Sequence, residues 1–328
     1  MLIAALCILS KDKANSVKKV LFNRYGSFDD LQMTDVQIPT IKDDELLIRV
    51  KVVSINPLDW KRLEGQLKIM TGFKFPQGIG IDFSGVVEKK GASISSFQVG
   101  DAVFGGVDPL KNAALAEYIV VKEAAIVKKP DAVSFETAAA AVTTGVTALH
   151  LLEKCHAKRG DSLLINGASG GVGMAVLQIA KQQGIKVTAA ASGDGLAFIK
   201  KWKPEATIDY KTQSALEQKT AYNAIVELAG NLPFGRAKAI LKPQSIFAST
   251  LPTPVDMLKA FLNNLFSSKK FIIIMANTTP DYYRQLCDLL TQKGLEIPIA
   301  KNFAMADFKE AYQFARKGGI VGKVMISI

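Results

Sequence analysis

A short apolar run, a glycine-rich turn and a helical repeat follow one another in residues 163–184. Residues 163–165 (LLI) come directly after Gly160, Asp161 and Ser162, and so short an apolar run predicts a buried parallel strand. The turn consists of Ala168, Ser169, Gly170, Gly171, Val172 and Gly173. Apolar residues then recur at helical spacing up to Gly184, which predicts a helix that ends there.

Strand, glycine turn and helix in this order are the context that a dinucleotide fingerprint requires. Small residues let the backbone approach a pyrophosphate, and the helix N-terminus offers unpaired N–H groups and the positive end of a dipole. The pattern is A-x-G-x-x-G, because Ala168 stands at the first glycine position. A turn that only packs a helix on a sheet is the alternative. We expect Gly173→Asp to abolish dinucleotide binding while leaving the fold largely intact.

The composition bounds the fold class and the compartment. With 328 residues, 48% of them hydrophobic, the chain is long enough for two domains with large cores. No apolar run approaches the ~20 residues of a membrane span. Residues 1–9 are apolar, but they lack the basic start and the cleavage site of a signal peptide. We expect residues 1–16 to be an appended segment outside the functional fold.

Cysteines and charges narrow the functional classes. Cys7, Cys155 and Cys287 are far apart and form no CxxC motif, which argues against a disulfide framework and a cysteine-rich zinc site. A reducing, cytoplasmic location is the simplest interpretation. The net charge is +11, with lysines in scattered pairs. These charges either solvate the surface or form a weak peripheral contact with anionic lipid or nucleic acid.

The first part of the chain predicts a β-rich, barrel-like domain. Short strand-like segments with glycine turns between them are typical of such domains. They are residues 17–22, 46–55, 81–88, 99–103, 116–121 and 125–128.

After Pro130 the pattern changes to alternating helices and strands, which predicts a doubly wound parallel sheet. Helices are expected at residues 134–141, 146–155, 171–183, 195–202, 213–220 and 234–241, and strands at 162–167, 186–191, 206–210, 224–229 and 245–249. A further apolar run covers 272–275, and a helix is expected at 281–293. The strand-like residues 297–300 and 323–328 flank a helix at 306–316. We assign 17–133 and 280–328 to the first domain and 134–279 to the cofactor-binding domain.

Several motifs together resemble the medium-chain dehydrogenase/reductase superfamily. The matching segments are residues 54–61 (SINPLDWK), 80–85 (GIDFSG), 97–104, 116–118, 143–148 (TTGVTA), 159–161, 168–173 and 318–323. They are most similar to its zinc-free quinone oxidoreductase branch, in particular to the chloroplast-envelope type. The resemblance implies a GroES-like catalytic domain joined to a Rossmann domain, and we expect a homodimer.

Two positions indicate whether the chain can bind zinc. Zinc alcohol dehydrogenases carry a cysteine where this chain has Asn56 and a histidine where it has Ile81. Neither asparagine nor isoleucine is a zinc ligand, so we predict no metal. His150 and His156, the only histidines, are expected to be packed or solvated.

The resemblance implies hydride transfer from NADPH to a quinone or to the C=C bond of an enone. The product anion can take its proton from solvent. Asn56 is the predicted catalytic residue, because its amide can donate a hydrogen bond to the substrate carbonyl. Alternatively, Asn56 is a turn residue before Pro57, and Asp59 would then hold the loop. Many relatives have a substrate-contacting tyrosine where this chain has Leu67, which weakens an enoyl-thioester reductase interpretation.

Cofactor choice depends on the end of the second parallel strand, where an acid would bind the ribose of NAD. This chain has Ser192 there, and Lys211 after Tyr210 could supply a positive charge, so we predict NADPH. Asp194 argues the other way. The remaining predicted cofactor contacts are Thr144, Thr147, Ala229, Gly230, Ser249 and Thr250. A non-catalytic protein that binds lipid or RNA through its basic surface is the alternative from another class.

Overall fold

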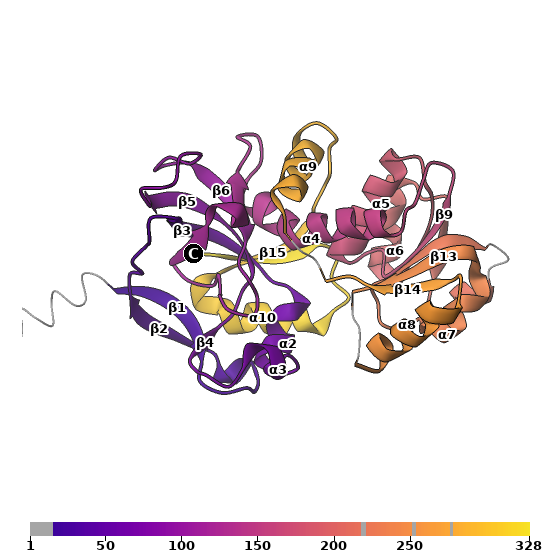
Figure 1. The fold of residues 1–328 in the computed structure, drawn as a ribbon, viewed down its shortest axis with the longest axis horizontal. Coiled ribbons are helices and arrows are strands. Elements are labelled where there is room, and N and C mark those ends of the chain that lie inside the picture. The colour runs from indigo at the N-terminus through magenta and orange to yellow at the C-terminus, as the bar shows by residue number, and fades with distance from the viewer. Residues whose placement is uncertain (1–15, 218–220, 251–253, 276–277) are drawn as a thin grey trace, which may run out of the picture.

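The structure is a computed structural model that describes residues 16–217, 221–250, 254–275 and 278–328. The chain forms a barrel domain and a parallel-sheet domain, which lie side by side and are joined by a central helix (Figure 1). The predicted appended segment lies outside the described residues, except for Ser16, which already begins the first strand.

The barrel domain contains two sheets. A small sheet has the strand order β2-β1-β4, and a larger one has the order β15-β16-β3-β5-β6-β8, with β7 also paired to β3. The strands are β1 (Ser16–Phe22), β2 (Gln32–Gln37), β3 (Glu45–Ser54), β4 (Gln77–Gly78), β5 (Asp82–Lys90), β6 (Ala102–Gly106), β7 (Tyr118–Lys122), β8 (Ile126–Lys128), β15 (Ile299–Ala304) and β16 (Lys323–Ser327). The predicted strand at 99–103 begins too early, because Gly100 and Asp101 form the turn that precedes β6.

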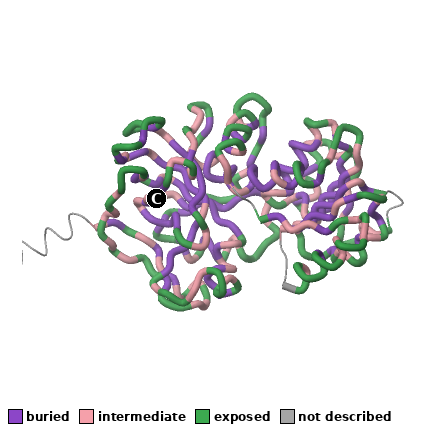
Figure 2. Tube along the Cα trace, in the orientation of Figure 1, coloured by how far each residue is buried: buried purple, intermediate pink, exposed green. Residues whose placement is uncertain are grey.

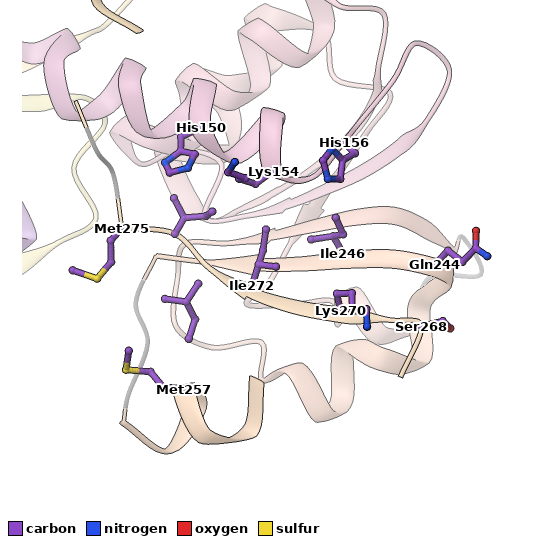
Figure 3. A pocket seen from close by; sticks show the side chains of 12 residues that line it. His150, Lys154, His156, Gln244, Ile246, Met257, Ser268, Lys270, Ile272 and Met275 are labelled. Atoms are coloured by element: carbon purple, nitrogen blue, oxygen red, sulfur yellow. The ribbon is translucent and has the colours of Figure 1, made fainter. Parts of the chain in front are cut away.

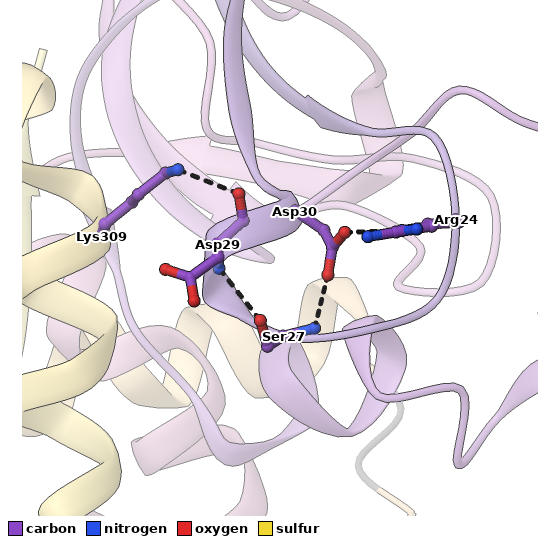
Figure 4. A network of polar contacts seen from close by, with 5 residues as sticks. All are labelled: Arg24, Ser27, Asp29, Asp30 and Lys309. Carbon is purple, nitrogen blue, oxygen red and sulfur yellow. Dashed lines mark hydrogen bonds and ion pairs between the residues drawn. The ribbon is translucent and has the colours of Figure 1, made fainter.

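Short helices complete this domain: α2 (Pro57–Leu63), α3 (Lys68–Thr71) and α10 (Phe308–Lys317). Late residues of the chain do return to the barrel, since β16 pairs with β3 in the register Ile326 to Val53. Figure 4 shows a second tie, in which Lys309 of α10 donates to the Asp29 carbonyl at 3.0 Å. Asp29 belongs to a short turn that Ser27 and Asp30 cap reciprocally.

One long helix, α4 (Phe135–Lys154), replaces the two helices predicted at 134–141 and 146–155. Gly145 does not interrupt it. A Cβ on Gly145 would lie 2.4 Å from Leu286, so this glycine allows α9 (Pro280–Thr291) to pack closely against α4. Among the described helices, α4 alone is long and apolar enough to cross a membrane, but 72% of its apolar window is buried, as expected for a core helix.

The parallel-sheet domain has the strand order β11-β10-β9-β12-β13-β14 with parallel pairing throughout, which confirms the predicted doubly wound sheet. Its strands are β9 (Ser162–Asn166), β10 (Lys186–Ala191), β11 (Ala206–Asp209), β12 (Tyr222–Glu227), β13 (Leu241–Ser249) and β14 (Lys270–Ile273). Its helices are α5 (Gly171–Gln182), α6 (Gly193–Ile199), α7 (Phe234–Ala237) and α8 (Pro254–Phe266).

Two predicted helices of this domain are shorter than expected. Of residues 213–220, the described part contains a single 3-10 turn at Ala215–Glu217. The helix predicted at 234–241 is α7 followed by a 3-10 turn, because Leu241 already begins β13. The buried residues, purple in Figure 2, concentrate in the sheets and in α4 and α5.

Candidate active site

The carboxyl ends of the parallel strands place polar side chains next to one another. Glu227 at the end of β12 is in register with Asn166 of β9 on one side and Ser249 of β13 on the other. The sheet reverses its strand order between β9 and β12, and ligands of doubly wound sheets bind outside that point.

The glycine-rich turn fits a dinucleotide. Gly167 adopts a left-handed conformation (φ +92°), and the N–H groups of Gly167 and Ala168 both donate to the Ala190 carbonyl. A Cβ on Gly170 would meet nothing closer than 3.5 Å, so the backbone before α5 is open to a ligand there. The helix N-terminus that follows can accept a pyrophosphate.

Gly173 has another role than the one predicted. A Cβ at Gly173 would lie 2.2 Å from the Gly167 carbonyl oxygen and 2.8 Å from the Ala168 Cα. It would therefore point into the turn, and the expectation that Gly173→Asp leaves the fold largely intact is wrong. Gly173 allows the helix to pack on the strand, which is the third-glycine role in such fingerprints.

Glu227 and Asn166 form a buried pair that the sequence reasoning missed. Asn166 Nδ2 donates to Glu227 Oε2 and to Asn231 Oδ1, both at 2.6 Å. Glu227 Oε1 accepts from the N–H groups of Ala229 at 2.8 Å and Gly230 at 2.5 Å, and burial raises the Glu227 pKa. The pair shapes the loop that holds the predicted contacts Ala229 and Gly230. In the sequence, the glutamate within the otherwise apolar predicted strand 224–229 is the feature that could have identified this pair.

The predicted adenosine-side residues meet at the ends of β10 and β11. Ala191 is in register with Asp209, so Ser192 and Tyr210 follow at neighbouring strand ends. Ser192 is half-buried, whereas Tyr210 and Lys211 are exposed. Asp194 is exposed in the first turn of α6, and Thr250 is half-buried after β13.

Ser169 of the glycine-rich turn lies next to α6, the helix that follows β10. A Cβ on Gly195 would lie 2.5 Å from the Ser169 Oγ, so the hydroxyl occupies the space above α6 that a side chain at 195 would take.

A second polar network connects the two domains. The Lys323 ammonium at the start of β16 donates to the Ile55 carbonyl and to Asn56 Oδ1, both at 2.7 Å. Asn56 Nδ2 donates to Asp82 Oδ2 at 2.9 Å and to the Ser54 carbonyl at 3.2 Å. Asp82 Oδ1 accepts from the Thr143 hydroxyl of α4 at 2.7 Å. The network thus joins β16, the loop before α2, β5 and α4.

The buried charged groups of this network shift one another's pKa values. Burial raises the pKa of Asp82 and lowers that of Lys323, while each opposes the shift of the other. Burial also raises the pKa of Asp59 to about 7. Asp59 Oδ2 accepts from the Asn56 N–H at 2.8 Å, which caps α2.

These contacts correct the predicted role of Asn56. The residue is 3% exposed and both hydrogens of its amide are donated inside the protein, so none is left for a substrate carbonyl. Asn56 is a positioning residue in this structure, and Asp59 holds its loop, as the alternative had it.

The network and the glycine turn touch each other. A Cβ on Gly171 would lie 3.0 Å from the Lys323 Cδ and 3.4 Å from the Thr144 Oγ1. Thr144 and the equally buried Thr147 lie on α4. The glycine-rich turn and Thr144 therefore lie next to the buried Lys323 side chain, where the two domains meet.

Within the described ranges, no group of three or more His, Cys, Asp or Glu side chains could hold a metal ion. His150 and His156 lie away from the fingerprint. They line a groove of about 870 Å³ between the end of α4 and strands β13 and β14 (Figure 3).

Comparison with known proteins identifies the family. Residues 42–131 match the alcohol dehydrogenase GroES-like domain, and residues 205–326 match a domain described as zinc-binding dehydrogenase. The chain is 27% identical to the chloroplast envelope quinone oxidoreductase homolog of Arabidopsis thaliana over 93% of this chain and 96% of that protein. It is 31% identical to the NADPH-dependent alkenal/one oxidoreductase of the same plant over 65% of this chain and 58% of that protein.

A solved structure agrees with these matches over nearly the whole chain. The quinone oxidoreductase from Coxiella burnetii superposes with a TM-score of 0.88 at 28% identity, covering 95% of this chain and 99% of that one. As its motifs predict, the chain therefore belongs to the medium-chain dehydrogenase/reductase superfamily and is an oxidoreductase that uses a nicotinamide cofactor.

Proposed function

We propose that the protein is a metal-independent oxidoreductase that transfers a hydride from NADPH to a quinone or to the C=C bond of an α,β-unsaturated carbonyl compound. The observation that carries the proposal is the closed network of Lys323, Asn56, Asp82 and Thr143. It surrounds Asn56, where the zinc members of the superfamily have a cysteine ligand, and Ile81 stands where they have a histidine. In this network the site is held together by an ammonium group and hydrogen bonds.

Asn56 and Ile81, at the positions of the two zinc ligands, favour one reaction class. Reduction of a simple aldehyde develops charge on an alkoxide, which a metal ion stabilises as a Lewis acid. A quinone or an enone spreads the developing charge over a conjugated system, and solvent can protonate the resulting anion. Such acceptors do not depend on a metal for this step.

The chain's own residues would bind and orient the reactants. Bound NADPH supplies the hydride, and the protein supplies its position. The turn at 168–173 would hold the pyrophosphate at the start of α5, and Thr144 and Thr147 would lie on the nicotinamide side. The bonds that Asn56 makes with Lys323 and Asp82 would hold its loop in place beside the reactants.

The end of β10 supports NADPH. The residue directly after Ala191 is Ser192 rather than an acid, its hydroxyl can bond a 2′-phosphate, and the exposed Lys211 follows the neighbouring strand, whereas Asp194 opposes a phosphate. The name of one relative points the same way, because it is an NADPH-dependent alkenal/one oxidoreductase.

The test is NADPH oxidation by the purified protein with a panel of quinones, enones, enoyl thioesters and simple aldehydes, with and without a chelator. We expect turnover with quinones or enones that the chelator does not change. Turnover confined to aldehydes and lost with the chelator contradicts the proposal. Turnover confined to enoyl thioesters assigns the protein to the related reductase class, and no turnover with intact NADPH binding indicates a binding protein.

A further inference from the structure

The carboxylate of Glu227, which is 4% exposed, holds the loop that follows β12. Its Oε1 accepts the N–H groups of Ala229 and Gly230, and the N–H of Asn231 bonds to the same carboxylate. Its Oε2 accepts from Asn166 Nδ2 of β9 at 2.6 Å. Three consecutive backbone N–H groups thus converge on one side chain, and this fixes the path of the loop around it.

The same loop packs against the glycine-rich turn. The Leu228 N–H donates to the Asn166 carbonyl at 2.9 Å. A Cβ on Gly167 would lie 3.1 Å from the Ala229 nitrogen and 3.2 Å from the Leu228 carbonyl carbon. Gly230 then reverses the chain with a φ of +77°, which a glycine adopts without strain. The loop therefore lies beside the turn that precedes α5, at the carboxyl edge of the sheet.

The hydrogen-bond partners of Glu227 are uncharged donors. The Asn166 amide comes from β9, the backbone N–H groups come from the loop, and Ser249 of β13 lies beside Glu227 in the sheet. Burial raises the pKa of Glu227, and these hydrogen bonds oppose that shift. A proton on either carboxylate oxygen would face a donor hydrogen, so the ionised form alone makes all of these bonds. Glu227 therefore carries a negative charge that none of these groups neutralises.

Glu227 ends the strand over which the nicotinamide half of the cofactor would bind. Ser192, the predicted contact of the adenosine half, follows β10, and β10 lies on one side of β9. Strand β12 lies on the other side of β9, across the point where the strand order reverses. The two nucleotide halves of a dinucleotide bind on opposite sides of this point. The loop and the charge of Glu227 would therefore be on the nicotinamide side.

We propose that Glu227 is a positioning residue that holds residues 228–231 against the glycine-rich turn, and that its buried negative charge makes the site favour the oxidised cofactor. The oxidised nicotinamide ring carries a positive charge and the reduced ring carries none, so a negative charge nearby favours the oxidised form. A site with this preference promotes transfer of the hydride to the acceptor. The inference rests on the nicotinamide cofactor of the proposed function and not on the choice of acceptor.

The experiment compares Glu227→Gln with the double variant Asn166→Asp/Glu227→Gln. The single substitution removes the charge and places a second amide donor against the Asn166 amide. The double substitution reverses the direction of the hydrogen bond between the two positions and returns a carboxylate to the neighbouring strand. The matched control is Glu205→Gln, which neutralises an exposed glutamate directly before β11.

The readouts are calorimetry with NADPH and with NADP⁺, and hydrogen exchange of the loop amides in the cofactor-free protein. For Glu227→Gln we expect faster exchange in the loop and weaker binding of both cofactor forms, with NADP⁺ weakened about three- to thirtyfold more than NADPH. In the double variant, loop exchange and the ratio of the two dissociation constants should return to within about threefold of the wild type. Glu205→Gln should behave like the wild type in both measurements.

Three outcomes overturn the proposal: unchanged loop exchange in Glu227→Gln, equal weakening of NADPH and NADP⁺ in that variant, and no recovery in the double variant. Thermal unfolding shows whether each variant keeps its fold. If Glu227→Gln does not fold, the double variant decides, because wild-type loop exchange there supports the proposal and fast exchange or loss of the fold contradicts it. A wild-type protein that binds neither cofactor form contradicts the proposed function as well, whereas normal binding with an unchanged ratio overturns this inference alone.

Discussion

The polar regions around Asn56 and at the ends of β10 and β11 are organised in opposite ways. Around Asn56 the side chains are buried and bond to one another, across β16, α2, β5 and α4. At the ends of β10 and β11 the backbone is fixed by the sheet, but Ser192, Tyr210 and Lys211 face solvent to differing degrees. The side chains of the first region are held by hydrogen bonds to one another, whereas those of the second are more open to a ligand.

This difference separates stability from specificity. Removing a member of the buried network leaves a charge without its partner, which destabilises the fold. Removing a member of the exposed edge is expected to change the cofactor preference and to leave the fold unchanged.

The largest effect is expected for Lys323→Met. It leaves Asp82 buried without the nearby ammonium, and the free energy of unfolding should fall by about 3–5 kcal/mol in denaturant titrations. Lys301→Met on the neighbouring strand β15 is the control, since that ammonium pairs with Glu310 at the surface and should contribute less than about 1 kcal/mol. Equal effects of the two substitutions would show that the network is not held by its charges.

Asp59 should make stability depend on pH. Its folded-state pKa of about 7 lies above its ordinary value, so the native state binds a proton that the unfolded state does not between about pH 4 and pH 7. Stability from this group is therefore present at low pH and lost as pH rises through about 7, by on the order of 2–4 kcal/mol. Asp59→Asn should make this fall smaller in thermal unfolding measured across the range, while Asp82 and Glu227, whose pKa values are also raised, contribute the rest.

Asp30 provides a control of opposite sign. Hydrogen bonds from the Ser27 N–H and the Arg24 guanidinium hold its pKa below the usual range (Figure 4). Its contribution is lost only as pH falls below about 4, so Asp30→Asn should leave the slope between about pH 4 and pH 7 unchanged. A slope that is unchanged in Asp59→Asn would assign the dependence to another group.

Gly173 and Gly170 of the glycine-rich turn allow the same comparison, of stability against binding, within one motif. Gly173→Ala places a Cβ against the Gly167 carbonyl and should cost about 1–3 kcal/mol of stability. Gly170→Ala meets nothing closer than 3.5 Å and should unfold normally while binding NADPH more weakly. Calorimetry and thermal unfolding of both variants check this. Normal stability of Gly173→Ala would contradict the packing role.

The smallest effect concerns cofactor choice. We expect a preference for NADPH over NADH of about tenfold, because a charge-assisted contact to phosphate at an exposed edge contributes about 1.5 kcal/mol. Lys211→Ala should lower this ratio of dissociation constants and Asp194→Ala should raise it, and added salt should reduce it. Equal dissociation constants at low salt would show that Ser192 and Lys211 do not contact the phosphate.

The sequence predicts the sheets better than the networks. Short apolar runs identify most strands of the doubly wound sheet, because each run is long enough only for a strand. The partners of Asn56 could not be found in this way, since Asp82 lies 26 residues away and Lys323 267 residues away. Local spacing does not say which distant polar groups the fold brings together.

Two helices show how tertiary packing overrides a local pattern. Gly145 lies in the gap between the helices predicted at 134–141 and 146–155. In the structure its close contact with Leu286 makes it an interior residue of α4. Helix α8 was not predicted at all. Its asparagines bond to the turn before β14 and into that strand, so its polar face is the packed one.

The position of β16 has a consequence for synthesis of the chain. This strand lies between β15 and β3, yet the ribosome makes it only after the complete parallel sheet. Until then the Val52–Ser54 part of one edge of β3 is unpaired and the Lys323 contacts are missing while the second domain folds. The larger sheet of the barrel and the network around Asn56 are therefore completed only after the strands of the parallel sheet have been made.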